Sequence, residues 1–352
     1  MKQPWIRSAR YDGWLVLAPP FLALLVVMLL PPPFRATAQM PLVAWVGLVV
    51  FIDVAHVYST LFRTYFDPAR RRQQRQLLWL VPLGCYLAGV ALHYAGGLVF
   101  WRVLAYLAVF HFVRQQYGFL RLYARHEPSS TGRRLDAVVI YAATIYPLLY
   151  WHLSPGRNFN WFVDGDFVQY DWPAGRVVTT VLYVGLLLLY AGKEIRQGWR
   201  TGAFNLPRNL LILGTAGSWY FGIVYFNGDL AFTLLNVVAH GIPYLALVWL
   251  SSQPTPDEPA RNRRWWTGKY GGVVFLGLLF LLAFLEEGTW DGLVWREHGA
   301  VFGWFQHLPA IHDPRLLTLL VPLLALPQAT HYVLDGFIWR RPRQPAGPDA
   351  QI

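Results

Sequence analysis

Apolar runs of roughly 20 residues recur along the whole chain, and this feature constrains the fold more than any other. A helix of about 20 residues is long enough to cross the hydrocarbon core of a bilayer. Inside lipid every backbone amide needs an internal partner, so an apolar run at this depth has to be helical. The pattern predicts an all-α, polytopic transmembrane helical bundle of about ten spans: 14–30, 41–62, 77–95, 98–123, 136–153, 177–193, 209–226, 230–250, 270–286 and 314–338.

Composition and charge agree with a membrane protein and exclude several other classes. Only 14% of the residues are charged, whereas soluble proteins carry about 25%. The net charge of +11 comes from Arg and Lys in short loops between apolar runs, so it indicates membrane topology and no nucleic-acid partner. Cys85 is the only cysteine, which excludes an intramolecular disulfide and any metal site built from several cysteines.

The charges between the runs predict how the chain is oriented. With ten spans, six basic segments fall on one side of the membrane, and the acidic segments 164–171 and 286–297 fall on the other. Because cytoplasmic loops are enriched in Lys and Arg, we expect both termini in the cytoplasm, with the protein in a bacterial inner (cytoplasmic) membrane. Residues 1–338 then form a single transmembrane domain, and the Pro- and Arg-rich segment 339–352 is expected to be a disordered cytoplasmic tail.

Four histidines lie at membrane depth, where ionisable side chains are costly and are functional candidates. They are His56, His111, His240 and His331, on the second, fourth, eighth and tenth spans. These spans all run in the same direction, and each histidine lies roughly 10–17 Å from the cytoplasmic boundary at about 1.5 Å per residue. Four imidazoles at one depth predict a shared metal site in the cytoplasmic half of the bundle.

Polar neighbours at helical spacing strengthen this prediction. Residues three or four positions apart share a helix face, and a ligating histidine commonly donates its second N–H to a carboxylate or carbonyl. Arg114 lies about two turns inside its span, and we expect it to pair with Asp53 or Asp335. The candidate catalytic residues around the site are therefore Asp53, Arg114, Gln115, Asn236 and Asp335.

Several kinds of site remain compatible with four buried histidines. Neutral imidazole binds Fe(II), Zn and Cu, so the residue types alone do not select the metal. An opposed histidine pair could hold a haem, and a proton or substrate pathway needs no metal at all. Purely structural, hydrogen-bonded histidines are the fourth alternative. The chain has no P-loop, no catalytic Ser-His-Asp motif and no dinucleotide fingerprint in a suitable context.

In architecture the chain resembles integral-membrane, histidine-ligated oxygenases of the Brp/Blh type, which cleave β-carotene. That family is polytopic and uses four histidines on one iron, and His56, His111, His240 and His331 are the matching candidates. The HxxxH and HxxHH boxes of membrane fatty-acid desaturases and hydroxylases are absent. The resemblance implies an Fe(II) enzyme that uses O₂ to oxidise, desaturate or cleave a lipophilic substrate, such as a lipid, an isoprenoid or a carotenoid.

Two other functions use the same residues. A proton-coupled transporter would use the buried His, Asp and Arg side chains as a relay, and a haem protein would carry electrons. The lipid bilayer and a lipophilic small molecule are the expected partners, and the sequence does not identify an electron donor.

Overall fold

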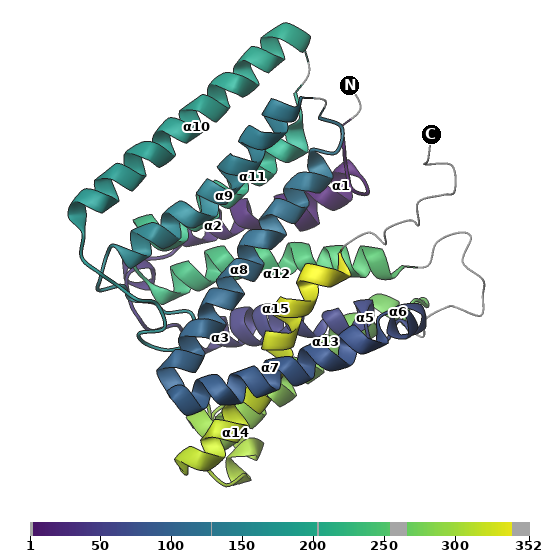
Figure 1. Cartoon of the computed structure of the whole chain (residues 1–352), viewed down its shortest axis with the longest axis vertical. Helices are drawn as coiled ribbons and strands as arrows, with labels where there is room; N and C mark the ends of the chain where they lie inside the picture. The colour runs from purple at the N-terminus through teal and green to yellow at the C-terminus, as the bar shows by residue number, and fades with distance from the viewer. Residues whose placement is uncertain (1–2, 128, 203, 254–265, 340–352) are drawn as a thin grey trace, which may run out of the picture.

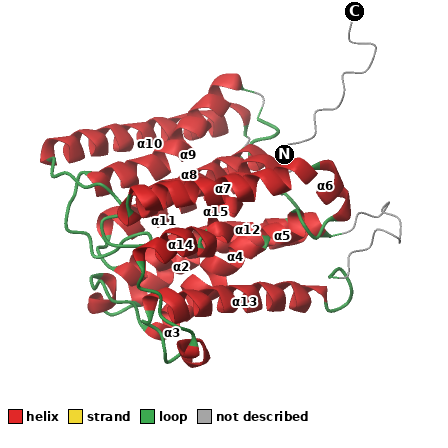
Figure 2. Ribbon diagram, turned by 60° about the horizontal axis from the view of Figure 1, so that its bottom comes forward, coloured by secondary structure: helices red, strands yellow, loops and turns green. Residues whose placement is uncertain are grey.

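The computed structural model describes residues 3–127, 129–202, 204–253 and 266–339. Within these ranges the chain forms helices joined by turns and loops, and no strand occurs (Figures 1 and 2). The elements are α1 (Ala9–Asp12), η1 (Gly13–Leu17), α2 (Pro19–Leu29), η2 (Pro32–Arg35), α3 (Leu42–Trp45), η3 (Val46–Val54), α4 (Ala55–Tyr58), α5 (Thr60–Arg63), α6 (Pro68–Gln73), α7 (Arg75–Ala95), α8 (Gly97–Tyr123), α9 (Ser130–His152), α10 (Pro173–Thr201), α11 (Leu206–Trp219), η4 (Tyr220–Tyr225), α12 (Asp229–Ser252), α13 (Gly271–Trp290), η6 (Asp291–Trp295), η7 (Gly303–His307), α14 (Pro314–Leu324) and α15 (Leu326–Ile338).

The all-α prediction is confirmed, and each predicted span falls on a helical segment. In the described residues, six segments are long and apolar enough to cross a membrane, or up to eight if two bent pairs each count as one span. The chain is therefore a membrane protein of several spans. Helix α9 and the α11–η4 segment are not among those candidates. The six are Leu42–Arg63, Arg75–Ala95, Gly97–Tyr123, Pro173–Thr201, Asp229–Ser252 and Gly271–Trp295.

Prolines explain the two bent pairs. The segment Ala9–Leu17 meets α2 at 46°, where Pro19 and Pro20 begin the second helix. Helix α14 meets α15 at 42°, and Pro327 stands in the first turn of α15. Proline has no N–H to donate and its ring collides with the preceding turn, so a helix breaks or bends there.

Helix α12 lies at the centre of the bundle, whereas α10 lies at its edge. In the apolar stretch of α12, 78% of the residues are buried, against 17% for α10. Helix α12 packs against α2, η3, η4 and α11, while α10 packs mainly on α9 (Figure 1). A helix that is apolar on all sides and central can hold a polar group away from both lipid and water, and His240 is on this helix.

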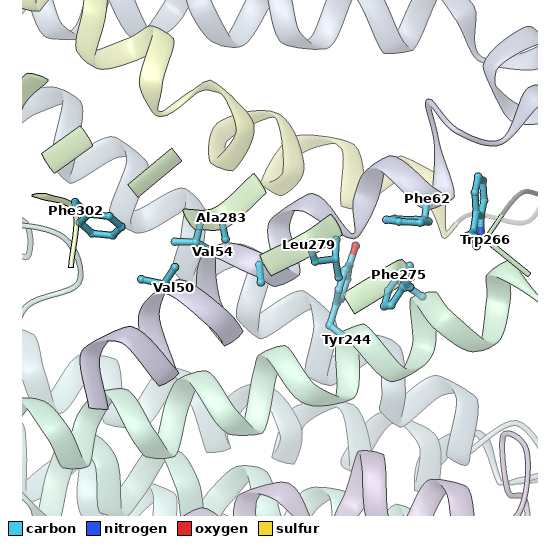
Figure 3. Packing of buried hydrophobic residues seen from close by; sticks show 11 residues of the cluster. Val50, Val54, Phe62, Tyr244, Trp266, Phe275, Leu279, Ala283 and Phe302 are labelled. Carbon is cyan, nitrogen blue, oxygen red and sulfur yellow. The ribbon is translucent and has the colours of Figure 1, made fainter. Parts of the chain in front are cut away.

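The second span packs antiparallel to α13 and forms with it a large apolar cluster (Figure 3). Phe302 and Val50 belong to one end of this cluster, and Phe62 and Trp266 belong to the other; the rings of Phe62 and Trp266 are 5.1 Å apart. Tyr244 of α12 joins the cluster from the central helix. This packing fixes the position of η3 and α4 along the axis of α12, and therefore the position of His56.

We name the two ends of the bundle by their surface residues. The basic end carries the arginines of α6, and a buried ion cluster lies near it. There Arg208, which is fully buried, donates to Glu127 at 2.6 Å and to Asp136 at 3.1 Å. Lys193 contacts Asp136 at 2.6 Å. Arg208 and Lys193 are thus bound to acidic side chains between helices. Removing one member of such a cluster leaves another charge unpaired.

The cap end is formed by the segment 291–313, which follows α13. The Asp291 carboxylate accepts hydrogen bonds from the backbone amides of Glu297 and His298, both at 2.8 Å, and from the Gln306 side chain. The His298 ring stacks on Trp45 with 3.8 Å between centroids. The cap is therefore anchored to the start of the second span.

The predicted tail lies almost wholly outside the described residues, which end at Trp339. Trp339 itself belongs to the bundle, because its indole N–H donates to Asp335 at 2.6 Å. Trp339 therefore contacts the helix that carries His331.

Candidate metal centre

The four predicted histidines converge at one point in the interior of the bundle. The Nε2 atoms of His56 and His240 are 3.1 Å apart, and those of His111 and His331 are also 3.1 Å apart. Ligand atoms of His56, His111 and His240 all lie within 4.8 Å of one another. All four side chains are buried. The matched depths in the sequence therefore correspond to a real cluster in three dimensions.

Each histidine comes from a different helix, and local structure sets its position. His56 follows the π-helix η3, and π-helical turns change which side chains face a neighbouring helix. His240 lies beside Gly241, where α12 and η3 approach so closely that a Cβ would lie 2.6 Å from the Ile52 side chain. His331 lies in α15, just after the bend from α14.

The four rings form a quadrilateral. Neighbouring ring centroids are separated by 4.7 Å for His56–His240, 4.9 Å for His240–His111, 4.5 Å for His111–His331 and 5.0 Å for His331–His56. The diagonal from His56 to His111 is longer, at 6.2 Å. Neighbouring planes are steeply inclined, by 67° to 85°, while the two diagonal rings are nearly parallel at 15°. Four imidazoles thus surround one central position.

Three of the outward-facing Nδ1 atoms lie near oxygen atoms. His111 Nδ1 is 3.2 Å from Asp335 Oδ2, and His331 Nδ1 is 2.6 Å from the Thr60 hydroxyl. His56 Nδ1 lies 3.6 Å from Asp53 Oδ1, beyond hydrogen-bond distance. An oxygen acceptor at Nδ1 fixes the ring and directs the lone pair of Nε2 inward, as second-sphere groups do in metal sites.

Asp335 is the most connected of the predicted neighbours. Its Oδ1 accepts from the Tyr244 hydroxyl at 2.8 Å and from the Trp339 indole at 2.6 Å, while Oδ2 faces His111. The carboxylate therefore ties the last two turns of α15 to α12 and α8. Its contact with the cluster is through His111.

Gln115 and Asn236 are buried beside the cluster but do not contact the inward ring atoms. Gln115 donates to the backbone carbonyl of His240 at 3.0 Å and so joins α8 to α12. Asn236 donates to the carbonyl of Phe232 at 2.8 Å. The Asn236 carbonyl oxygen and His240 Nδ1 are both buried without a hydrogen bond in the described structure. Asn236 therefore does not hydrogen-bond to His240, which lies four residues further along α12.

The expected pairing of Arg114 with Asp53 or Asp335 is wrong. Arg114 is exposed on the outer face of α8, where its guanidinium donates to the Tyr141 hydroxyl at 2.5 Å and lies 5.1 Å from the Tyr117 ring centre. On α8 it directly precedes Gln115, whose side chain points inward, so helical geometry turns Arg114 away from the site. Position along the span alone gave no information about this direction.

Sequence reasoning missed three side chains that shape the site. The Tyr244 ring is between 5.2 and 6.3 Å from the centroids of all four imidazoles, so it covers one face of the quadrilateral. The Phe112 ring stacks on His240 at 3.4 Å. Thr60 bonds to His331. A usable signal was present for Tyr244 and Thr60, because each stands four residues after a ligand candidate.

Three of the four histidines, His56, His111 and His240, have ligand atoms close enough together to hold a metal ion. Two nitrogens bound to one ion at about 2.1 Å lie about 3.0 Å apart for a right angle between the bonds and about 3.4 Å apart for a tetrahedral angle. The two observed Nε2 separations of 3.1 Å fall in this range. Nitrogen lone pairs directed at each other repel unless a proton or a cation lies between them. Imidazole nitrogens in this number suit Fe, Zn or Cu.

The remaining histidines do not form a second cluster of this kind in the described part of the chain. His298 stacks on Trp45, and His152 Nδ1 is 2.6 Å from the Val168 carbonyl oxygen.

Comparisons with known proteins do not assign the chain to a family. No family model matches the chain, and no curated protein or solved structure is significantly similar to it.

Proposed function

We propose that this protein is a membrane metalloenzyme in which His56, His111, His240 and His331 hold one metal ion, Fe(II) in the first instance. The observations that support this proposal are the group of His56, His111 and His240 ligand atoms within 4.8 Å of one another, and the 3.1 Å contact that brings His331 Nε2 to His111 Nε2. Iron held by imidazoles supplies chemistry for activating O₂. The proposed reaction is oxidation, desaturation or cleavage of a lipophilic substrate, and the Brp/Blh-type resemblance supports the same class.

The residues around the cluster support chemistry in a dry site. Phe112 and Tyr332 border the rings, and Tyr244 covers one face. Excluding water protects reactive species from side reactions, which oxidation of a hydrocarbon requires. An isoprenoid, carotenoid or acyl chain dissolved in the bilayer could reach such a site without crossing an aqueous phase.

The geometry favours a single ion over a bis-histidine haem. A haem needs two opposed imidazoles with an open plane between them for the macrocycle. Here His56 and His111 are the nearly parallel diagonal pair, but His240 and His331 occupy the space between them, with ring centroids 4.5 to 5.0 Å away. The site is therefore the size of an ion.

Elemental analysis of the detergent-purified full chain, with a visible spectrum of the same sample, tests the proposal. We expect about one equivalent of iron per chain and no haem band, because four imidazoles bind one ion. Single replacement of His56, His111, His240 or His331 by Ala should lower the bound metal severalfold, since each removes a ligand.

The His126→Ala variant is the matched control, because His126 is exposed and lies outside the cluster. It should keep its metal. Equal metal content in all five variants would overturn the site. If the wild-type chain binds no stoichiometric metal even after anaerobic reconstitution, the buried side chains would instead point to a proton-coupled transporter.

We further propose ten spans with both termini in the cytoplasm, so that the basic end faces inward across a bacterial inner membrane. The alternation of basic and acidic segments supports this orientation. Labelling with a membrane-impermeant maleimide in a Cys85→Ser background tests it. Ala300→Cys at the cap end should react in intact cells, whereas Ser129→Cys at the basic end should react only after lysis. The reverse pattern would invert the topology.

A further inference from the structure

A cavity of about 300 Å³ lies between α9, α10 and the α11–η4 segment. Helices α10 and α11 each pack on α9 but hardly on each other, which leaves this space between them. Most of the lining is apolar and includes Val184 and Leu187 of α10, with Ala216 and Phe221 of the α11–η4 segment. None of the four histidines is among the described residues that line it, so the cavity is separate from the candidate metal centre.

The cavity opens on the outer surface of the bundle. Val184 lines the cavity and is still 47% exposed. Apolar side chains about one turn away on either helix are exposed as well, at Val181 and Leu188 on α10 and at Leu213 on α11. Helix α10 is one of the candidate membrane spans, so this surface faces acyl chains. A molecule dissolved in the bilayer can therefore reach the cavity without crossing water.

Tyr183 is the unusual member of the lining. Its side chain is only 6% exposed, yet its hydroxyl forms no hydrogen bond within the described part of the chain. Its ring stacks on that of Tyr146, with 4.3 Å between centroids and 14° between planes, which fixes where the phenol lies. The Tyr146 hydroxyl, by contrast, is 2.9 Å from the Thr180 hydroxyl. A buried hydroxyl without a partner is costly, so Tyr183 has a donor available for a ligand.

The remaining lining limits what the ligand can be. Tyr220 is a second phenol that lines the cavity and forms no hydrogen bond with the residues described. The described residues of the lining include no charged side chain, so a charged ligand would have no counter-charge there. If a cavity of about 150 Å³ holds one benzene, this one holds about a dozen non-hydrogen atoms. The ligand is therefore a neutral molecule, or the end of one, with an oxygen that can accept a hydrogen bond.

We propose that this cavity is a lipid-binding site, which takes the oxygen-bearing end of a neutral long-chain lipid from the bilayer. The Tyr183 hydroxyl donates to a carbonyl or hydroxyl oxygen of that lipid, and the apolar lining covers the adjacent carbon atoms. The rest of the chain stays among the acyl chains of the membrane. The site shares no residue with the histidine cluster, so this inference does not rest on the proposed metal centre.

Photolabelling of the detergent-purified full chain tests the site. The probe is hexadecanol with a diazirine next to its hydroxyl-bearing end, and mass spectrometry of peptides locates the cross-links. We expect saturable labelling within 183–187 and 216–221, which excess unlabelled hexadecanol displaces. Gly217→Leu should abolish this labelling, because Gly217 lines the cavity and a Cβ there would have no atom within 4 Å, so the leucine side chain fills open space. Gly185→Leu on α10 meets equally open space outside the lining and should be labelled like the wild type.

Tyr183→Phe tests the hydrogen bond. We expect the half-saturating concentration of the alcohol probe to rise about two- to tenfold, the effect of losing one net hydrogen bond. The same diazirine on a hydrocarbon chain without oxygen should label the wild type and the Tyr183→Phe variant alike. Tyr170→Phe is the matched control, because Tyr170 is 71% exposed and lies outside the cavity.

The outcomes separate a site from general partitioning of the probe. Equal labelling of the wild type and Gly217→Leu would overturn the site and show that the probe only coats the outer surface. An unchanged half-saturating concentration in Tyr183→Phe would overturn the assigned hydrogen bond. If Gly217→Leu is not monodisperse, Ala216→Leu at the neighbouring lining position decides the question. Metal content should equal that of the wild type in every variant, so failure of this site and failure of the metal centre are distinguishable.

Discussion

At the scale of single residues, the polar groups around the cluster are organised by a spacing of four. Thr60 follows His56, Gln115 follows His111 and Tyr244 follows His240 by four residues, and Asp335 has the same relation to His331. The partners are nevertheless exchanged between helices. Asp335 faces His111 and Thr60 bonds to His331. Each partner thereby fixes a ring on another helix, which links the helices as well as the ligands.

Replacing Asp335 with Asn should weaken metal binding. Asp335 accepts from Tyr244 and Trp339 and faces His111, and an amide NH₂ cannot accept in place of a carboxylate oxygen. We expect the dissociation constant for the metal to rise about 10- to 100-fold, the usual effect of losing a second-sphere partner. Competition with a chelator of known affinity measures it.

Asp171→Asn is the control for this prediction, because Asp171 forms a surface pair with Arg176 and its side chain is largely exposed. Its metal affinity should be that of the wild type. Unchanged affinity in the Asp335→Asn variant as well would show that Asp335 stabilises the fold without orienting His111.

At the scale of elements, the site depends on the close approach of two segments. Gly241 allows α12 to contact η3, so that His240 and His56 meet with 3.1 Å between their Nε2 atoms. The π-helical geometry of η3 directly precedes His56. The glycine lies next to His240 and the π-helical turns lie next to His56. Each is a local irregularity in an apolar helix.

Gly241→Ala should therefore displace the two helices and lower metal retention, because the added Cβ would lie 2.6 Å from Ile52 Cγ2. We expect a loss of stability of roughly 1–3 kcal/mol from overpacking. The Ile52→Ala/Gly241→Ala double variant restores the space and should recover metal binding toward wild type. Metal content per chain and apparent Tm report the two effects. Failure of the double variant to recover either would show that Ile52 is not the obstacle.

At the scale of the whole molecule, the histidine cluster links four helices of the bundle. Its ligands come from segments far apart in the chain, and the His331–Thr60 contact alone joins positions 271 residues apart. A ligand that binds only the folded state stabilises it by mass action, by about 4 kcal/mol at a concentration a thousand times its dissociation constant. A bound metal ion should therefore stabilise the packing of α4, α8, α12 and α15 against one another.

Removing the metal should lower the apparent Tm of the purified chain. We expect a decrease of about 5–10 °C, since about 1 kcal/mol corresponds to a few degrees in a chain of this size. Differential scanning fluorimetry at a fixed scan rate, with and without a chelator, measures it. His240→Ala should melt at the same temperature under both conditions. A chelator effect that persists in this variant would place the stabilising ion elsewhere.

The sequence alone determined the helical membrane architecture and the four histidines, for physical reasons. Lipid leaves the backbone of an apolar run no alternative to a helix, and a buried imidazole is too costly to be placed without a partner. Counting residues from the basic loops was enough to put His56, His111, His240 and His331 at one depth. The number of spans that cross the membrane was less determined, because α9 and α11–η4 are less apolar than the other candidates.

The tertiary structure decided which way each side chain points and which residues pair. The first depends on the rotation of each helix about its axis, and the second on neighbours that are distant in sequence. It turned Arg114 outward to Tyr141, assigned Asp335 to His111 instead of a helix-local partner, and bonded Asn236 to the Phe232 carbonyl instead of to a histidine. It also buried Glu286, expected as a loop acid, within α13. A helix fixes the height of its side chains by rise per residue, whereas only packing fixes which way they point.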